Sequence, residues 1–219
     1  MLTGPEIIRE RDAGRLLIDP FDPAQVNPNS YDVRLAPEVA RLDTSFHAHS
    51  KTQYVNGGMI QDFDRPSIVD PKNPPALVSY EMTEDGMVLY PGVLYLASTW
   101  ERAGSQHFQA RVDGKSSLAR LGLMIHFTAG FGDVGFDGTW TLEMMVMHPM
   151  RVYPFMRVGQ VSFVPVIGTL QKYAGNYSMA DHALGRPVAS RMGASMKKDA
   201  ENMARLYAAY LAKQQKPKA

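Results

Sequence analysis

Hydrophobic and polar positions alternate over many short stretches of this chain, and a period of two is typical of β-strands. In SYDVRL, at residues 30–35, Tyr31, Val33 and Leu35 alternate with polar neighbours. Similar runs follow at HFQARV, TWTLEMMVM and VGQVSFVPVIG, and Pro165 in the last run indicates an edge or a strand end. Many short strands with turn signals between them predict a mainly β domain, a barrel or a sandwich.

A few local signals interrupt this pattern. Thr3 is suited to cap a short helix that ends at Gly14. The Pro91-Gly92 pair predicts a hairpin-like turn between two β-rich runs. Residues 170–191 show no core periodicity, so we expect an extended tail there.

The end of the chain has a different pattern. From Ser195 onward, apolar residues recur at spacings of three and four, which predicts a C-terminal amphipathic helix; they are Met203, Leu206, Tyr207, Tyr210 and Leu211. We therefore expect one main domain over residues 1–191 and a helical extension over residues 192–219.

Composition narrows the class of protein. The 219 residues are 45% hydrophobic and 21% charged, which suits one globular core. A formal net charge of +1 gives no general attraction to nucleic acid. No run approaches the roughly 18 to 20 apolar residues of a membrane helix, and the N-terminus lacks a signal-peptide pattern, so we expect a cytoplasmic protein without a membrane partner. The absence of cysteine excludes disulfides, a thiol nucleophile and Cys-ligated zinc.

The run GKSSLAR, at residues 114–120, is a candidate anion-binding turn. Glycine allows backbone amides to approach an anion, Ser116 and Ser117 add hydroxyls, and Lys115 and Arg120 add positive charge. The upstream glycine of a nucleotide-triphosphatase phosphate loop is missing, which excludes that motif. The alternative is a capped surface turn with solvated cations.

A single carboxylate, Glu143, lies within the predicted strand TWTLEMMVM. Alternation places Trp140, Leu142 and Met144 on one face, and Glu143 on the other. Among apolar neighbours its carboxyl would be partly desolvated, which raises its pKa and suits it to proton transfer. The alternative is an exposed glutamate paired with a cation.

Nearby residues allow two interpretations each. Asp133 and Phe136 lie in the glycine-rich run FGDVGFDG, where Asp133 is explained by turn chemistry or by a site, and Phe136 by stacking on a nucleotide or by core packing. His126 is expected to be a hydrogen-bonded core histidine on an apolar strand. His47 and His49 have no third metal ligand nearby and are expected in a surface loop.

These motifs together resemble a known family. GKSSLARLGL followed by H-x-TAGF-x-D-x-GF-x-G-x-x-TLE is similar to the dCTP deaminases of the dUTPase-like superfamily, including bifunctional members that also remove pyrophosphate. Supporting similarity extends along the chain in IDPFDP, NPNSYDVRL, LYPGVLYLAST, VGQVSF, KYAGNY and PVASR. Ordered motifs over about 190 residues are far more specific than one short pattern.

The resemblance implies a distorted dUTPase-like β-barrel with a few short helices, assembled as a homotrimer whose active sites are shared between subunits. It also implies a deoxycytidine nucleotide such as dCTP as substrate, with Mg²⁺ held through the triphosphate rather than by a protein metal site. Deamination at cytosine C4 would then proceed without zinc.

The resemblance also assigns roles to residues. Glu143 corresponds to the general acid/base, while Ser116 and Arg120 correspond to groups that bind phosphate and help to hold the water and the base. The remaining matches are substrate contacts: Lys115 and Ser117 in the turn, Thr128 and Ala129 in the strand that reads the pyrimidine, Asp133 near the 3′-hydroxyl and hydrolytic water, Phe136 on the deoxyribose, and Lys172, Tyr173 and Arg191 in the tail.

Three functions remain open at this point. The first is deamination of dCTP to dUTP and ammonia. The second is diphosphatase activity on dUTP, alone or after deamination, which Asp133 permits and which would yield dUMP. The third is a non-catalytic nucleotide-binding protein that uses its C-terminal helix to bind a partner. The chain also departs from the family pattern: Pro154-Phe155 replaces a proline-glycine pair, and Lys115 replaces an arginine.

Overall fold

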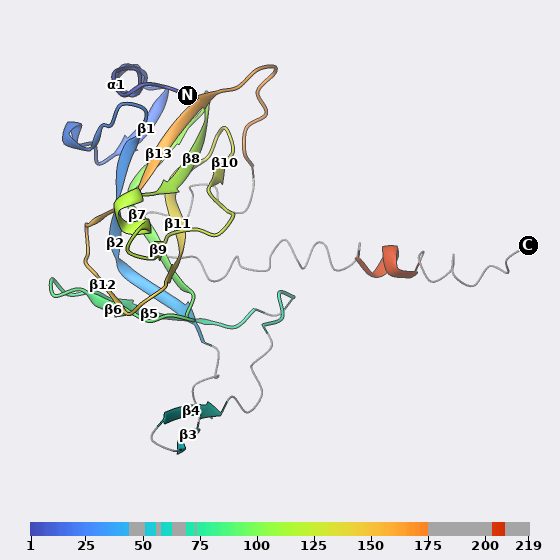
Figure 1. Cartoon of the computed structure of the whole chain (residues 1–219). Helices are drawn as coiled ribbons and strands as arrows, with labels where there is room; N and C mark the ends of the chain where they lie inside the picture. Colours follow the sequence, from blue (N-terminus) through green and yellow to red (C-terminus); the bar gives the residue numbers. More distant parts are fainter. Residues whose placement is uncertain (44–50, 56–57, 63–68, 73, 175–202, 209–219) are drawn as a thin grey trace, which may run out of the picture. The chain divides into compact units, whose positions relative to one another are not determined.

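A computed structural model describes residues 1–43, 51–55, 58–62, 69–72, 74–174 and 203–208 (Figure 1). The chain divides into two compact units. The first comprises Met1–Arg41 and Val78–Pro187, and the second comprises Leu42–Leu77 and Val188–Ala219. The expected boundary between residues 191 and 192 lies outside the described residues and stays a prediction.

The first unit begins with helix α1 (Gly4–Asp12). Thr3 is its N-cap in extended conformation but makes no side-chain capping hydrogen bond, and the fully buried Ile7 joins the core. Gly14 follows the helix at φ 72°, a left-handed conformation that glycine adopts without a steric cost. The predicted first helix is therefore confirmed, although the Thr3 hydroxyl does not cap it.

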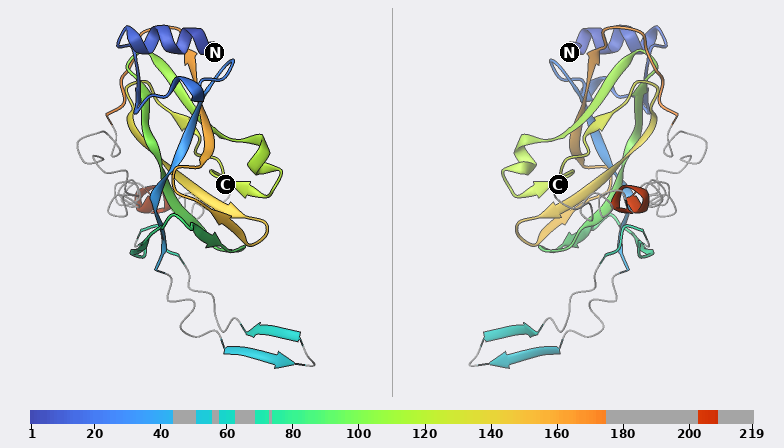
Figure 2. Two further views of the ribbon diagram at one scale, coloured as in Figure 1. Left: turned by 90° about the vertical axis from the view of Figure 1, so that its left-hand side faces the viewer. Right: turned by 90° about the vertical axis from the view of Figure 1, so that its right-hand side faces the viewer.

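Most of the first unit is one nine-stranded sheet (Figures 1 and 2). Its main path runs in the order β10 (Phe131–Gly132), β8 (Phe108–Gly114), β13 (Arg157–Pro165), β2 (Tyr31–Leu42), β7 (Tyr95–Ser105), β11 (Asp137–Val146) and β9 (Leu123–Met124). Off this path, β1 (Leu16–Asp19) pairs with β7 and β5 (Leu77–Glu81) pairs with β2. A short 3₁₀ helix, η1 (Pro23–Gln25), precedes β2.

The long strand β2 curls the sheet because it changes partners along its length. Its first residues pair with β13, and its later residues pair with β7 after a register shift between Leu35 and Val39. Figure 2 shows the resulting strongly curved sheet with α1 at one end. The buried core includes the fully enclosed Tyr31, Leu142 and Phe163. The predicted mainly β fold is confirmed, and Pro165 ends β13 as expected.

The predicted hairpin around Pro91-Gly92 is wrong in its pairing. The turn itself exists, with Gly92 at φ 79°. However, β6 (Met87–Leu89), which precedes the turn, pairs with β12 (Met150–Val152), whereas β7, which follows it, pairs with β1, β2 and β11. A turn signal specifies a local change of direction and not the partner of each strand.

Phe155 stands where the family resemblance implies a glycine, and its backbone conformation is one that favours glycine. It has φ 62°, a left-handed conformation that is rare for a bulky residue. Its ring packs edge-on against Trp100, with 4.9 Å between ring centroids. This aromatic contact offsets part of the backbone strain.

The second unit contains a two-stranded ladder of β3 (Lys51–Val55) and β4 (Gly58–Asp62). Residues 203–208 are helical, in agreement with the predicted C-terminal helix, and Met203, Leu206 and Tyr207 are exposed. The rest of that helix, like His47 and His49, lies outside the described residues. Within the described ranges, no helix has the length and apolar character needed to span a membrane.

Candidate active site

Glu143 projects from β11 on the face opposite to the core. Trp140, Leu142 and Met144 are buried, while Glu143 is only partly buried, as the alternating pattern predicted. Glu143 lies opposite Leu96 of β7 in an antiparallel register. Pairing with β7 therefore fixes the backbone at Glu143 and leaves the side chain at the edge of the core.

Hydrogen bonds compensate only partly for the burial of the Glu143 carboxyl. Its Oε2 atom is buried and accepts no hydrogen bond from the residues that the structure describes. Desolvation raises its pKa above the ordinary value of 4.5, while the charge that His126 can carry and hydrogen bonds from the Glu143 and Phe127 backbone partly oppose this rise. A carboxyl with a raised pKa exchanges protons closer to neutral pH than an exposed one.

His126 faces this carboxylate from the segment after β9, which is irregular; the expected strand at His126 is therefore wrong. Its Nε2 lies 3.6 Å from Asp113 Oδ1, and its buried Nδ1 has no hydrogen-bond partner in the described part of the chain. A β-carbon on Gly130 would lie only 3.0 Å from His126 Cε1, so glycine leaves the room that the ring occupies. Sequence reasoning missed this neighbour of Glu143.

The anion-binding candidate forms helix α2 (Ser116–Ala119), which directly follows β8. Ser116 and Ser117 open the helix, Arg120 ends it, and all three are exposed. α2 packs beside β9, and β9 pairs with the end of β11 through Met124 and Met145. These exposed polar side chains therefore stand at the same end of β11 as Glu143.

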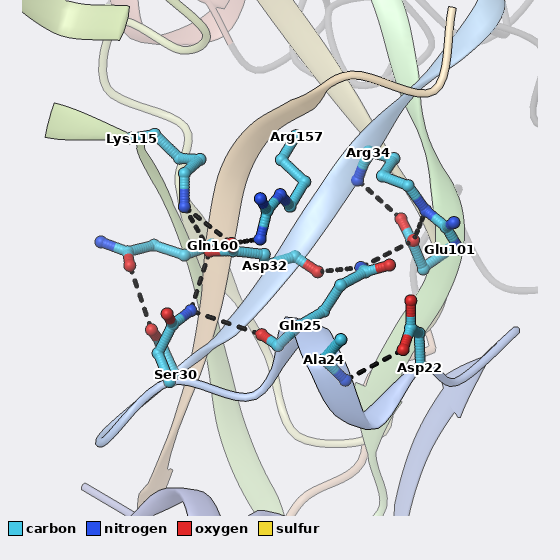
Figure 3. A network of polar contacts seen from close by, with 11 residues as sticks. Asp22, Ala24, Gln25, Ser30, Asp32, Arg34, Glu101, Lys115, Arg157 and Gln160 are labelled. Carbon is cyan, nitrogen blue, oxygen red and sulfur yellow. Dashed lines mark hydrogen bonds and ion pairs between the residues drawn. The ribbon is translucent and has the colours of Figure 1, made fainter. Parts of the chain in front are cut away.

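Lys115 differs from its neighbours in the turn. Its Nζ donates to both carboxylate oxygens of the buried Asp32, at 2.7 Å each (Figure 3). The predicted contact of Lys115 with substrate stays a prediction, since the structure assigns two of its three N–H donors to this ion pair. Asp32 was missed because it appears in SYDVRL only as a polar residue of an alternating strand.

A second group of predicted residues meets at the turn before β11. The Phe136 ring packs edge-on against Trp140 and against Tyr173, with centroid distances of 5.1 and 6.2 Å. The Tyr173 N–H donates to the Val134 carbonyl at 2.7 Å, which holds the tail against the turn. Asp133 and Lys172 are exposed on either side of this contact.

Gly135 allows the tail to approach the turn so closely. It has φ 95°, and a β-carbon there would lie 2.8 Å from Tyr173 N and 3.0 Å from Lys172 Cβ. Any other residue would strain the backbone and push the tail away.

The predicted site residues, together with their neighbours His126 and Gly135, therefore fall into two clusters. We call Ser116, Ser117, Arg120, His126 and Glu143 the carboxylate cluster, and Asp133, Gly135, Phe136, Lys172 and Tyr173 the turn cluster. Phe136 directly precedes β11 and lies seven residues before Glu143, which corresponds to about 23 Å at the usual rise of a strand. Thr128 and Ala129 lie between the clusters in an exposed, irregular loop, so their expected strand conformation is wrong. Arg191 lies outside the described residues.

Comparison with known proteins identifies the family of this chain. Residues 1–166 match the family model described as "dCTP deaminase-like". The chain belongs to the dCTP deaminase-like family. This match covers both clusters except for the tail residues Lys172 and Tyr173.

Curated relatives indicate the same family. A protein of Leptospira biflexa serovar Patoc named "dCTP deaminase, dUMP-forming" is 35% identical over 178 residues, which cover 81% of this chain and 89% of the relative. A protein of Clostridium beijerinckii with the same name is also 35% identical over 178 residues, which cover 81% and 90%.

A solved structure supports the fold. The 2′-deoxycytidine 5′-triphosphate deaminase of Agrobacterium tumefaciens aligns with 74% of this chain at a TM-score of 0.52 and 21% identity. The alignment spans 47% of that chain. The family model and the curated relatives confirm the predicted resemblance to the dCTP deaminases.

Proposed function

We propose that this protein hydrolytically deaminates dCTP and releases dUMP. The observation that carries the proposal is the partly buried Glu143, whose pKa is raised by desolvation and which lies at the same end of β11 as the exposed hydroxyl and guanidinium groups of α2. The names of the curated relatives support the same substrate and favour dUMP over dUTP as the product.

Glu143 would move the protons of the deamination. Its carboxylate takes a proton from water, and the resulting hydroxide forms a bond to cytosine C4. The tetrahedral adduct then collapses as the C4–N bond breaks, and the Glu143 carboxyl delivers the proton that lets the amino group leave as ammonia. Ser116 and Arg120 are suited to hold the water and the base, because both lie at the same end of β11.

Phosphate binding belongs to the exposed polar groups of α2, mainly Ser117 and Arg120. Among the described residues, no group of three His, Asp or Glu side chains is arranged to hold a metal ion. We expect Mg²⁺ to be coordinated by the triphosphate, and the proposed deamination needs neither Mg²⁺ nor zinc in a proton-transfer step.

Asp133 is the candidate for the second reaction. Its exposed carboxylate in the turn cluster is suited to orient a water molecule toward the α-phosphorus, with bond formation to that water and release of pyrophosphate. Deamination that stops at dUTP is the alternative, and it requires Asp133 to serve binding only.

The two clusters imply a site shared between copies of the chain. Phe136 is assigned to the deoxyribose and Glu143 to C4 of the attached base, but about 23 Å of strand separates them. Adjacent parts of one nucleotide cannot touch both residues of a single chain. We therefore propose that one subunit supplies the carboxylate cluster and another the turn cluster, within the homotrimer that the family resemblance implies.

One experiment separates these proposals. The purified chain is fractionated by size, and each fraction is incubated with dCTP and Mg²⁺ while ammonia and nucleotides are quantified. We expect activity only at the mass of three copies, with one dUMP formed per ammonia released. Accumulation of dUTP would reject the second reaction, activity at the mass of one copy would reject the shared site, and dCTP binding without turnover would support a non-catalytic protein.

A further inference from the structure

We propose that Asp32 is a positioning residue that holds Lys115 and Arg157 on one carboxylate and thereby sets the position of α2 for phosphate binding. This inference rests on the proposed function, because it concerns how the same chain handles the dCTP phosphates. It also gives Lys115 a role different from direct substrate contact.

Asp32 is surrounded by donors although it is only 1% exposed. Its Oδ1 accepts hydrogen bonds from Lys115 Nζ at 2.7 Å and from Asn27 Nδ2 at 2.8 Å. Its Oδ2 accepts from Lys115 Nζ at 2.7 Å and from Arg157 Nη1 at 3.3 Å (Figure 3). A buried carboxylate that accepts hydrogen bonds from two cations and one amide is held firmly in one position.

This carboxylate joins three segments that are far apart in the sequence. Asp32 belongs to β2, Arg157 is the first residue of β13, and Lys115 is the N-cap residue of α2. The Lys115 N–H also donates to the Val158 carbonyl, but at 3.2 Å. The ion pair is therefore the shorter and stronger of the two links that tie the start of α2 to the sheet.

A role in charge neutralisation alone would predict that loss of Asp32 strengthens triphosphate binding, whereas a positioning role predicts that it weakens binding. The cluster contains one carboxylate and two cations, and Arg157 keeps a side chain that is 55% exposed. If Asp32 only neutralised these cations, its removal would strengthen the binding of a triphosphate. If Asp32 positions α2, its removal weakens binding, because the Lys115 side chain, which is 23% exposed, loses its ion pair and turns toward solvent.

Glu101 offers a matched control in the same network. It is fully buried and accepts hydrogen bonds from the Arg34 backbone N–H at 2.7 Å and from Arg34 Nε at 2.6 Å. Gln25 Nε2 links it to the backbone carbonyl of Asp32 (Figure 3). Arg34 and Gln25 both lie outside α2, so Glu101 shares the burial of Asp32 without a bond to the phosphate-binding turn in the described structure.

The test compares Asp32→Asn, Lys115→Met, the double variant and Glu101→Gln. Each is assayed for KM and kcat with dCTP and for its melting temperature. We expect each single change at Asp32 or Lys115 to raise KM about tenfold or more, with kcat within about threefold. The double variant should regain melting temperature, because it leaves no unpaired buried charge, but its KM should stay as high as in the single variants.

The outcomes decide the role of Asp32 whether or not the single variants fold well. A KM in the double variant that recovers together with the melting temperature would show that Asp32 only stabilises the fold. A KM that falls in Asp32→Asn, or rises equally in Glu101→Gln, would also overturn the proposal. Failure of the unchanged protein to turn over dCTP would instead reject the proposed function.

Discussion

At the scale of single residues, Glu143 is the proposed proton-transfer group, and hydrogen bonds compensate only partly for the burial of its carboxyl. Its buried Oε2 has no hydrogen-bond partner in the described structure, and burial raises its pKa. The folded protein therefore favours the protonated carboxyl more than the unfolded chain does. Above the folded pKa, the charged form costs stability that an uncharged residue would not cost.

We therefore expect Glu143→Gln to raise the melting temperature by a few degrees at neutral pH. As the pH falls through the folded pKa, the native carboxyl becomes protonated and the advantage of glutamine disappears. Thermal unfolding across a pH series measures this difference. Glu81→Gln, at an exposed position of β5, is the control and should change the melting temperature little. A Glu143→Gln protein that is less stable at neutral pH would contradict this interpretation.

At the scale of elements, the turn cluster depends on the close approach of the tail to Gly135. The Tyr173 N–H bonds to the turn at Val134, and Phe136 contacts the Tyr173 ring. This contact places the proposed deoxyribose-binding ring and the tail in one structure. In the proposed site, the tail therefore contributes through a backbone position and not only through its side chains.

Gly135→Ala should raise the KM for dCTP about tenfold, because a β-carbon 2.8 Å from Tyr173 N forces the tail away. Gly92→Ala is the control: Gly92 also has a left-handed φ, of 79°, but nothing lies within 4 Å of the added carbon. Backbone strain should cost about 1 kcal/mol of stability in each variant, and the clash with the tail adds to this cost only in Gly135→Ala. Equal KM values in the two variants would show that the tail contact does not matter for binding.

Elements that are specified by residues close together in the chain could be predicted from the sequence. Alternation identified β11 and the face that carries Glu143, and helix signals identified α1. The sequence did not predict that β6 pairs with β12 instead of β7, because a turn residue says nothing about a partner strand some 60 residues away in the chain. The role of Asp32 could not be predicted for the same reason, because its ion-pair partner Lys115 lies 83 positions away in the chain.

At the scale of the whole molecule, family resemblance predicted the site residues, and the structure separates them into two groups. The sequence places Asp133, Phe136 and Glu143 in one short stretch, which suggests one site. An extended β11 instead separates the turn cluster from the carboxylate cluster. Closeness in sequence is thus a poor guide to the grouping of these residues in the proposed shared site.

The central claim is that Glu143 transfers the protons of dCTP deamination, and ammonia release by Glu143→Gln tests it most directly. Glutamine keeps the size of the side chain but can neither accept the proton of water nor return it. We expect ammonia release from dCTP to be abolished while the Kd for dCTP stays within about tenfold of the unchanged protein. Ammonia release at the rate of the unchanged protein would contradict the account.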